Sequence, residues 1–130
     1  NTETVVNLFY SDVKEFFQAN SIYFSEDMEI RGRSGLSHSF PFFIQNNKTH
    51  PDRFVRLSNR FTRSEAERFM FAWEDVAQIR NAKGKSSSLI ILINDTKKIN
   101  EELLANVIQY DSNIIPLPWS TRETKLKLFA

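Results

Sequence analysis

The sequence predicts an α/β fold of three layers, in which helices cover both faces of a mixed central sheet. Helix-like and strand-like hydrophobic patterns follow one another along the chain in the order αβββαβαβ. Residues 89–93 form a continuous apolar run of strand length, which is expected of a central strand that is buried on both faces. This strand should pair in parallel with a strand at residues 53–58, through a right-handed crossover that includes a helix.

One helix and three strands are predicted in the first half of the chain. Apolar residues recur at helical spacing through residues 2–20, which indicates an amphipathic helix with one buried face. Strands are expected at residues 23–31 and 36–44, joined by a turn that contains two glycines. A polar loop at residues 45–52 leads to the third strand.

The second half of the chain is predicted to alternate helix and strand. Ser64 suits the N-cap of a helix and Glu67 its third position, the pattern of a capping box, and an apolar helical face continues to Arg80. A third helix follows the apolar strand. The last strand, at residues 113–117, is expected at an edge of the sheet because proline has no backbone N–H to donate to a neighbouring strand. Residues 119–130 carry no clear pattern.

Length and composition indicate one globular domain over residues 1–130, in which 12 Phe predict an aromatic core. The absence of cysteine excludes disulfides and thiolate metal sites. No apolar run approaches the roughly 20 residues that cross a bilayer and no signal peptide is visible, so we expect a cytoplasmic location without membrane contact. Because the first residue is Asn1 and not Met, we expect a domain excised from a longer protein.

A net charge of +1 is too small to indicate nucleic-acid binding, but the basic residues are unevenly distributed. Several arginines fall in a short window that ends at Arg68, where their guanidinium groups could bind phosphates. A solvated surface with local ion pairs is the alternative. The candidate nucleic-acid-binding residues are Arg53, Arg56, Arg60, Arg63, Arg80, Lys83 and Lys85.

The tryptophans and histidines suggest packing more than chemistry. Trp73 lies on the apolar face of the second predicted helix and is expected in the core. Trp119, with Arg122, either contacts a partner or caps the core. His38 lies in a strand and is expected to be a packed side chain, whereas His50 lies in a polar loop. A zinc site would need further ligands, which the sequence does not provide at useful spacing.

Three groups of residues stand out as motifs. They are Gly32-Arg33-Ser34-Gly35-Leu36-Ser37-His38-x-Phe40-x-Phe42, Trp73-x-Asp75-x-x-x-x-Arg80, and Tyr110-Asp111 with Pro118-Trp119-Ser120-x-Arg122. Together they resemble a bacterial and phage family called domain of unknown function 1829, over nearly the whole chain. That family usually lies at the C terminus behind a second domain, so the resemblance implies that this chain is the C-terminal domain of a longer protein with a further N-terminal domain. The resemblance implies a restriction-endonuclease-like, PD-(D/E)XK relative of mobile-element or prophage origin.

The resemblance also implies a metal site that this sequence has lost. Metal-dependent nucleases of this fold use two acids to hold a divalent ion, and a lysine, where strands of the sheet separate. The family pattern has Asp at the position of Pro41, and Arg56 stands roughly where the Lys would be. Glu15 and Asp75 could form a rearranged catalytic site with Arg56, which would require Mg²⁺; otherwise no cofactor is expected. Alternatively, Asp75 is a helix-surface acid paired with Lys or Arg.

Three functional hypotheses follow from these patterns. The leading one is a catalytically degenerate nuclease-fold domain that binds nucleic acid through its arginine-bearing face. The second is an active metal-dependent nuclease that uses Glu15 and Asp75. The third is a protein-interaction or homo-oligomerisation module with exposed phenylalanines and Trp119 as anchors.

Overall fold

The computed structural model of the chain describes the backbone of residues 2–130 and the side chains of residues 4–130. It is an α/β structure with three helices and a five-stranded mixed sheet, and the predicted order αβββαβαβ is confirmed. None of the described helices is long and apolar enough to cross a membrane. The elements are α1 (Thr2–Ala19), β1 (Ser25–Arg31), β2 (Ser37–Ile44), β3 (Asp52–Ser58), α2 (Arg63–Ala82), β4 (Ser87–Ile93), α3 (Glu101–Tyr110) and β5 (Ile114–Pro118).

The five strands lie side by side in chain order, β1-β2-β3-β4-β5. Each of the first three strands runs antiparallel to its neighbour, and β4 and β5 continue the sheet in parallel with β3. The predicted parallel pairing is confirmed, with Val55 of β3 opposite Ile90 of β4. The expected edge strand is also confirmed, because β5 pairs only with β4 and can therefore carry prolines.

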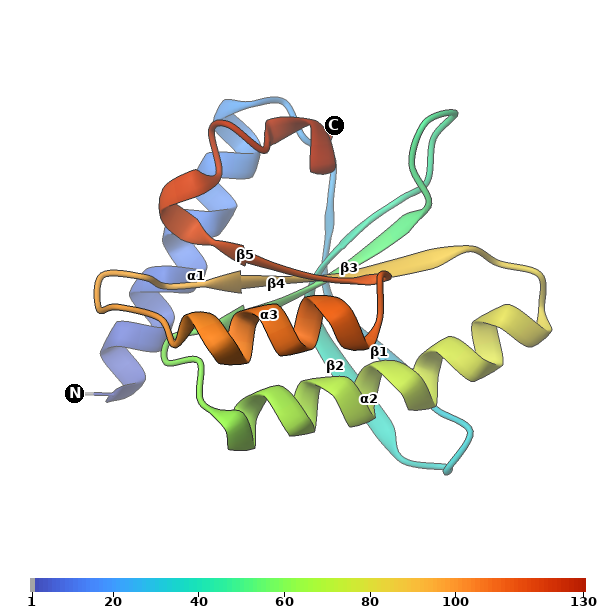
Figure 1. Cartoon of the computed structure of the whole chain (residues 1–130). Helices are drawn as coiled ribbons and strands as arrows, with labels where there is room; N and C mark the ends of the chain where they lie inside the picture. Colours follow the sequence, from blue (N-terminus) through green and yellow to red (C-terminus); the bar gives the residue numbers. More distant parts are fainter. Residues whose placement is uncertain (1) are drawn as a thin grey trace.

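Helices cover both faces of the sheet (Figure 1), with α1 and the C-terminal segment on one face and α2 and α3 on the other. The strand β4 supplies both cores. Ile90 and Leu92 pack toward α1, whereas Leu89 and Ile91 pack toward α2. Trp73 of α2 is 1% exposed, so the prediction that it belongs to the core is confirmed.

The ribbon of β1 and β2 changes face at Pro41. Asp27, whose φ of 52° is unusual for a residue other than glycine, lies opposite Pro41 between two regular strand pairs. As a result Phe40 packs toward α2, whereas Phe42 packs toward α1, although residues two apart on a regular strand share a face. The part of β2 before residue 42 does not pair with β3, since the two strands pair only through residues 42–44 of β2. A fork therefore opens between β2 and β3.

Two local features differ from the prediction or were missed by it. The N-cap of α2 is Thr62, whose side chain accepts a hydrogen bond from the backbone N–H of Glu65. The predicted box of Ser64 and Glu67 is wrong by two residues, because Thr62 and Glu65 have the same spacing and lie nearer the end of β3. The C-terminal segment, which showed no pattern, forms the short 3₁₀ turns η1 (Trp119–Thr121) and η2 (Leu126–Leu128).

Candidate functional site

The fork between β2 and β3 holds a cation between aromatic rings. The guanidinium carbon of Arg56 lies 5.0 Å from the ring centroid of Phe40 and 5.1 Å from that of Phe69 on α2. Burial lowers the pKa of Arg56, and the nearby charge of Arg68 lowers it further, but a guanidinium remains protonated at any physiological pH. The side chain of Pro41, on the β2 side of the fork, has no atom that could bind a metal. The fork thus contains a fixed positive charge and no carboxylate pair.

A shallow cavity of about 520 Å³ opens beside this fork, along the first half of α2. Its lining includes Arg56, Arg68 and Phe71, and the ring of Phe71 is 50% exposed. Arg68 is exposed, and its contact with an acid, Glu65, is long at 3.8 Å. We call this region the arginine surface and define it by the residues Arg56, Arg60, Arg63, Arg68 and Phe71.

Acidic residues compensate only part of the charge of the arginine surface. Glu67 pairs with Arg63, with a distance of 2.8 Å between Oε1 and Nε, on the solvent side of α2. Glu65 accepts a hydrogen bond from Ser58, and burial raises the pKa of its carboxyl group. Because residues 56–71 carry four arginines and only two glutamates, the arginine surface keeps a net positive charge.

Asp75 on α2 fastens the tip of the β1–β2 hairpin to the helix. Its Oδ1 accepts a hydrogen bond of 2.7 Å from the backbone N–H of Ser34, and its Oδ2 accepts one of 2.6 Å from the Ser34 hydroxyl. His38 Nε2 lies 2.8 Å from the same Oδ2 and donates to it. The Ser34 hydroxyl is the main cause that lowers the pKa of Asp75, and His38 adds to the effect. Gly32 packs so closely that a Cβ there would lie 2.0 Å from Oδ2.

This cluster is a structural junction in which Ser34 and His38 both bind the carboxylate and not each other. A Ser–His–Asp relay needs the serine hydroxyl on the histidine, which is absent from this arrangement. The interpretation of Asp75 as a surface acid paired with Lys or Arg is wrong, because Asp75 is 6% exposed and its side-chain partners are Ser34 and His38. The expectation that His38 is a packed, satisfied histidine is confirmed.

The three predicted catalytic residues do not meet. Arg56 and Asp75 lie on the α2 side of the sheet, whereas Glu15 belongs to α1 on the opposite face, beside Trp119 and Arg122. Among the described residues, no group of three or more His, Cys, Asp or Glu side chains could hold a metal ion. A metal site shared by Glu15 and Asp75 therefore has no support in this geometry, and a catalytic role for these residues stays a prediction.

Two of the predicted phosphate-binding arginines serve inside the protein. Arg53 is 2% exposed and donates hydrogen bonds to four backbone carbonyl groups, which belong to Gln45, Pro51, Leu128 and Ala130. Arg80 binds the carboxylate of Asp52 and the hydroxyl of Ser87, with its guanidinium over the ring of Phe54. Neither guanidinium is presented to a nucleic acid.

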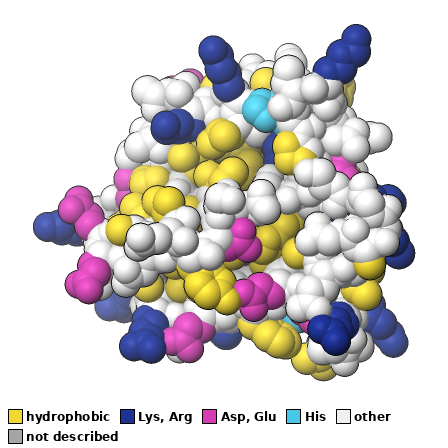
Figure 2. Space-filling view, turned by 45° about the vertical axis from the view of Figure 1, so that its right-hand side comes forward, with side chains coloured by type: hydrophobic (Ala, Val, Ile, Leu, Met, Phe, Trp, Pro, Cys, Tyr) yellow, Lys and Arg dark blue, Asp and Glu magenta, His cyan; other side chains and the backbone are white. Residues whose placement is uncertain are grey.

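The remaining predicted cations lie in two separate places. Arg60 and Arg63 belong to the arginine surface, whereas Lys83 and Lys85 follow the last turn of α2. Because α2 has 20 residues, its ends are about 30 Å apart. Figure 2 likewise shows Lys and Arg side chains spread around the periphery of one face and not gathered in a single patch.

Trp119 and Arg122 close the core beneath α1. The ring of Trp119 contacts Phe9 and Phe16 edge-on, with centroids 5.5 and 5.3 Å apart. Arg122 lies over Trp119 at 4.4 Å and donates a hydrogen bond to its carbonyl group. The core-capping interpretation of Trp119 is confirmed, and a contact with a partner stays a prediction.

The sequence interpretation missed Phe71 and Lys48. Phe71 lies off the apolar face of α2 that Phe69, Trp73 and Val76 form, so helical spacing could have marked it as an exposed aromatic residue from the sequence. Lys48 precedes β3, and Lys85 precedes β4. Because β3 and β4 are parallel, the loops before them lie at the same end of the sheet, and this reasoning could have brought the two lysines together from the sequence.

The family model for the domain of unknown function DUF1829 matches residues 32–122, which is more than half of the chain. The chain belongs to this family. The DUF1829 match includes the Asp75 junction and the arginine surface and leaves out α1. None of the curated proteins matches the sequence.

One solved structure, that of a protein of unknown function called AF1548, is similar to this DUF1829 chain. The TM-score is 0.63 at 13% sequence identity. The match covers 92% of this chain and 62% of that one, so this chain spans less than two thirds of the AF1548 structure. At this identity the likeness concerns the fold alone.

Proposed function

We propose that this DUF1829 domain is a catalytically degenerate nuclease-fold domain that binds nucleic acid without cleaving it. The observation that carries the proposal is the fork between β2 and β3. Nucleases that resemble this architecture hold their metal ligands where these strands separate, and here Pro41 and the stacked guanidinium of Arg56 occupy that place. The order of elements, with one helix on one face and two on the other, supports the same relationship.

The arginine surface supplies the chemistry for binding. The guanidinium groups of its three exposed arginines, Arg60, Arg63 and Arg68, are suited to phosphate oxygens, which they can bind through two parallel hydrogen bonds. The half-exposed ring of Phe71 beside them can stack on a base, an interaction of about 1–3 kcal/mol per base in single-stranded complexes. The combination of separated arginines and one exposed aromatic ring favours single-stranded DNA or RNA over a duplex.

Fluorescence anisotropy with a labelled single strand of about 16 nucleotides tests this proposal. The wild-type domain should bind at low salt and weaken as NaCl rises from about 50 to about 200 mM. The double variant Arg63→Ala/Arg68→Ala should bind more weakly, and its log–log salt slope should flatten by roughly 0.7 for each arginine that contacts a phosphate. Phe71→Ala should lower the affinity without changing the slope.

The matched control is Lys125→Ala/Lys127→Ala, which removes two exposed positive charges from the C-terminal segment. This control should bind like the wild type, because that segment packs on the α1 face of the sheet, opposite the face that carries α2 and the arginine surface. Absence of binding to both DNA and RNA at low salt would refute the proposal. Cleavage of the strand in Mg²⁺ or Mn²⁺ that Asp75→Ala abolishes would instead support the active-nuclease hypothesis.

A further inference from the structure

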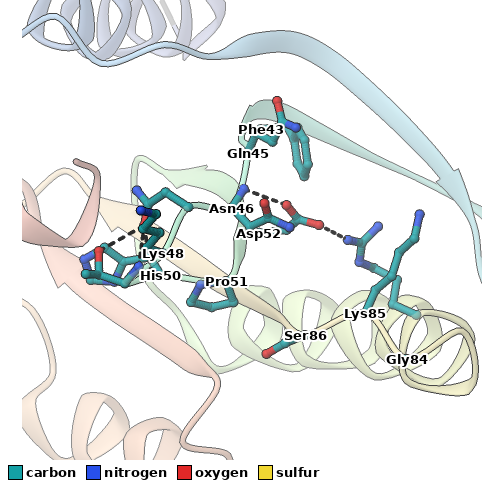
Figure 3. Close-up of a pocket in the computed structure, with 13 residues that line it drawn as sticks. Phe43, Gln45, Asn46, Lys48, His50, Pro51, Asp52, Gly84, Lys85 and Ser86 are labelled. Atoms are coloured by element: carbon teal, nitrogen blue, oxygen red, sulfur yellow. Dashed lines mark hydrogen bonds and ion pairs between the residues drawn. The ribbon is translucent and has the colours of Figure 1, made fainter.

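A second cavity, of about 800 Å³, lies at the other end of α2. The β2–β3 loop, the first residue of β3 and the loop between α2 and β4 form its walls (Figure 3). Lys48 and His50 lie on the side of the first loop, Lys85 lies on the side of the second loop, and Asp52 lies between them. The cavity shares no lining residue with the cavity of the arginine surface.

Hydrogen bonds within the chain already hold the walls of this cavity in place. Asn47 Oδ1 accepts hydrogen bonds from the backbone N–H groups of Thr49 and His50, which fixes the turn that carries Lys48. Asp52 Oδ1 accepts a hydrogen bond of 2.8 Å from the backbone N–H of Asn46, so the start of β3 is tied to the same loop. The site is thus preformed, as ligand cavities usually are.

The second wall is equally constrained. Arg80 binds Asp52 from the end of α2, so the floor of the cavity is an ion pair. Gly84 has a φ of +71°, a conformation that suits glycine, and it turns the chain so that Lys85 and Ser86 line the cavity. The sequence Gly84-Lys85-Ser86 precedes a strand and not a helix, so no helix N-terminus takes part in binding here.

The charge of the cavity is positive and largely uncompensated. The charges of Arg80 and Asp52 cancel within their ion pair. The side chains of Lys48 and Lys85 are exposed, and their ammonium groups form no hydrogen bond or ion pair within the part of the chain that the structure describes. Neutral polar side chains accompany the lysines, namely the amides of Gln45 and Asn46 and the hydroxyl of Ser86. Two free ammonium groups beside neutral hydrogen-bonding groups form a typical environment for phosphate.

We infer that this cavity binds a small phosphorylated ligand of about nucleotide size, which lies between Lys48 on one wall and Lys85 on the other. The volume lies within the roughly 300–1,000 Å³ of small-molecule sites, and it exceeds what a single inorganic ion needs. The inference is independent of the proposed nucleic-acid binding, because the arginine surface lies along the first half of α2 and this cavity lies at its end.

NMR titration of the ¹⁵N-labelled domain tests this inference with three probes, which are inorganic pyrophosphate, adenosine monophosphate and adenosine. Pyrophosphate and adenosine monophosphate should shift the amide signals of residues 45–50 and 84–86, whereas adenosine should not. Tighter binding of adenosine monophosphate than of pyrophosphate would identify a nucleotide site, and the reverse would identify a polyphosphate site. Both results support a phosphorylated ligand.

The variants Lys48→Ala and Lys85→Ala should each weaken pyrophosphate binding roughly tenfold or more. Both side chains are exposed, so thermal unfolding should be unchanged. Lys97→Ala/Lys98→Ala is the charge-matched control and should bind like the wild type. The inference is overturned if the phosphorylated probes leave these residues unshifted at millimolar concentration, if adenosine binds as well as its monophosphate, or if Arg63→Ala/Arg68→Ala weakens pyrophosphate binding as much as the two lysine variants do.

Discussion

Replacement of Arg53 by methionine distinguishes two roles for this residue. The sequence suggested binding of nucleic acid, whereas the structure shows hydrogen bonds to four backbone carbonyl groups. The guanidinium of Arg53 reaches from β3 to the carbonyl groups of Leu128 and Ala130 at 3.0 and 3.2 Å, and to those of Pro51 and Gln45 at 3.0 and 2.9 Å. It therefore ties the C-terminal segment to the loop that precedes β3. Because its charge is held away from water, burial lowers the pKa of Arg53.

The magnitude of the effect follows from the exposure of the four acceptors. Gln45 and Ala130 are exposed, so water can replace the lost donor there, whereas Pro51 and Leu128 are only partly exposed. Each hydrogen bond from a charged donor contributes about 1.5–3 kcal/mol, so two that water does not replace amount to about 3–6 kcal/mol. Methionine keeps the apolar stem and avoids burying a charge, which reduces the loss. We expect Arg53→Met to lower the free energy of unfolding by about 2–4 kcal/mol.

Urea unfolding followed by tryptophan fluorescence measures this change, and Arg63→Met provides the control. Arg63 is exposed and its guanidinium contacts only Glu67, so its replacement should change the free energy of unfolding by less than about 1 kcal/mol. A loss below about 1 kcal/mol for Arg53→Met would refute the reasoning. So would a folded Arg53→Met variant of full stability that loses affinity for single-stranded nucleic acid, because Arg53 would then contact the ligand as its sequence environment suggested.

Three further predictions concern the hairpin junction and the core. Gly32→Ala should lower the melting temperature more than Gly35→Ala. A Cβ at Gly32 collides with Asp75, whereas a Cβ at Gly35 has no neighbour within 4 Å and costs only the strain of a positive φ. Equal losses in thermal unfolding would contradict this. The folded state lowers the pKa of Asp75, so the carboxylate's contribution to stability is present above the unfolded pKa of about 4 and is lost as the pH falls through the lowered folded-state pKa. Urea unfolding should therefore show the difference between wild type and Asp75→Asn shrinking as the pH falls below about 4, and a constant difference would contradict this. Trp119→Ala should destabilise the domain by about 2 kcal/mol or more, because the ring packs on two phenylalanines of α1; sedimentation that shows lost self-association at unchanged stability would favour a partner-binding role instead.

Local patterns predicted the elements well because their causes are local. The apolar residues 89–93 can be buried on both faces only in the middle of a layered sheet, and β4 lies there. The N-cap of α2 shows the limit of such reasoning, since Thr62 and Ser64 both stand three residues before a glutamate. Spacing alone could not choose between them, and the place where the chain leaves β3 decides for Thr62.

The face change at Pro41 could not be predicted from alternation. A regular strand would place Phe40 and Phe42 on the same side of the sheet. The left-handed conformation of Asp27 on the neighbouring strand breaks the alternation at the same level, so Phe40 faces α2 and becomes a support for Arg56. The fork, which determines what the candidate site contains, is therefore a property of two paired strands and not of either one.

By itself, the sequence determined the order of helices and strands and the aromatic core, because these depend on residue type and short-range spacing. Only the tertiary structure decided which charged groups reach a ligand. Arg53 meets its acceptor Leu128 across 75 positions, and Asp75 meets Ser34 across 41. Burial of a charge depends on such distant partners, so identical arginine side chains become a core clamp at Arg53 and a candidate phosphate-binding group at Arg68.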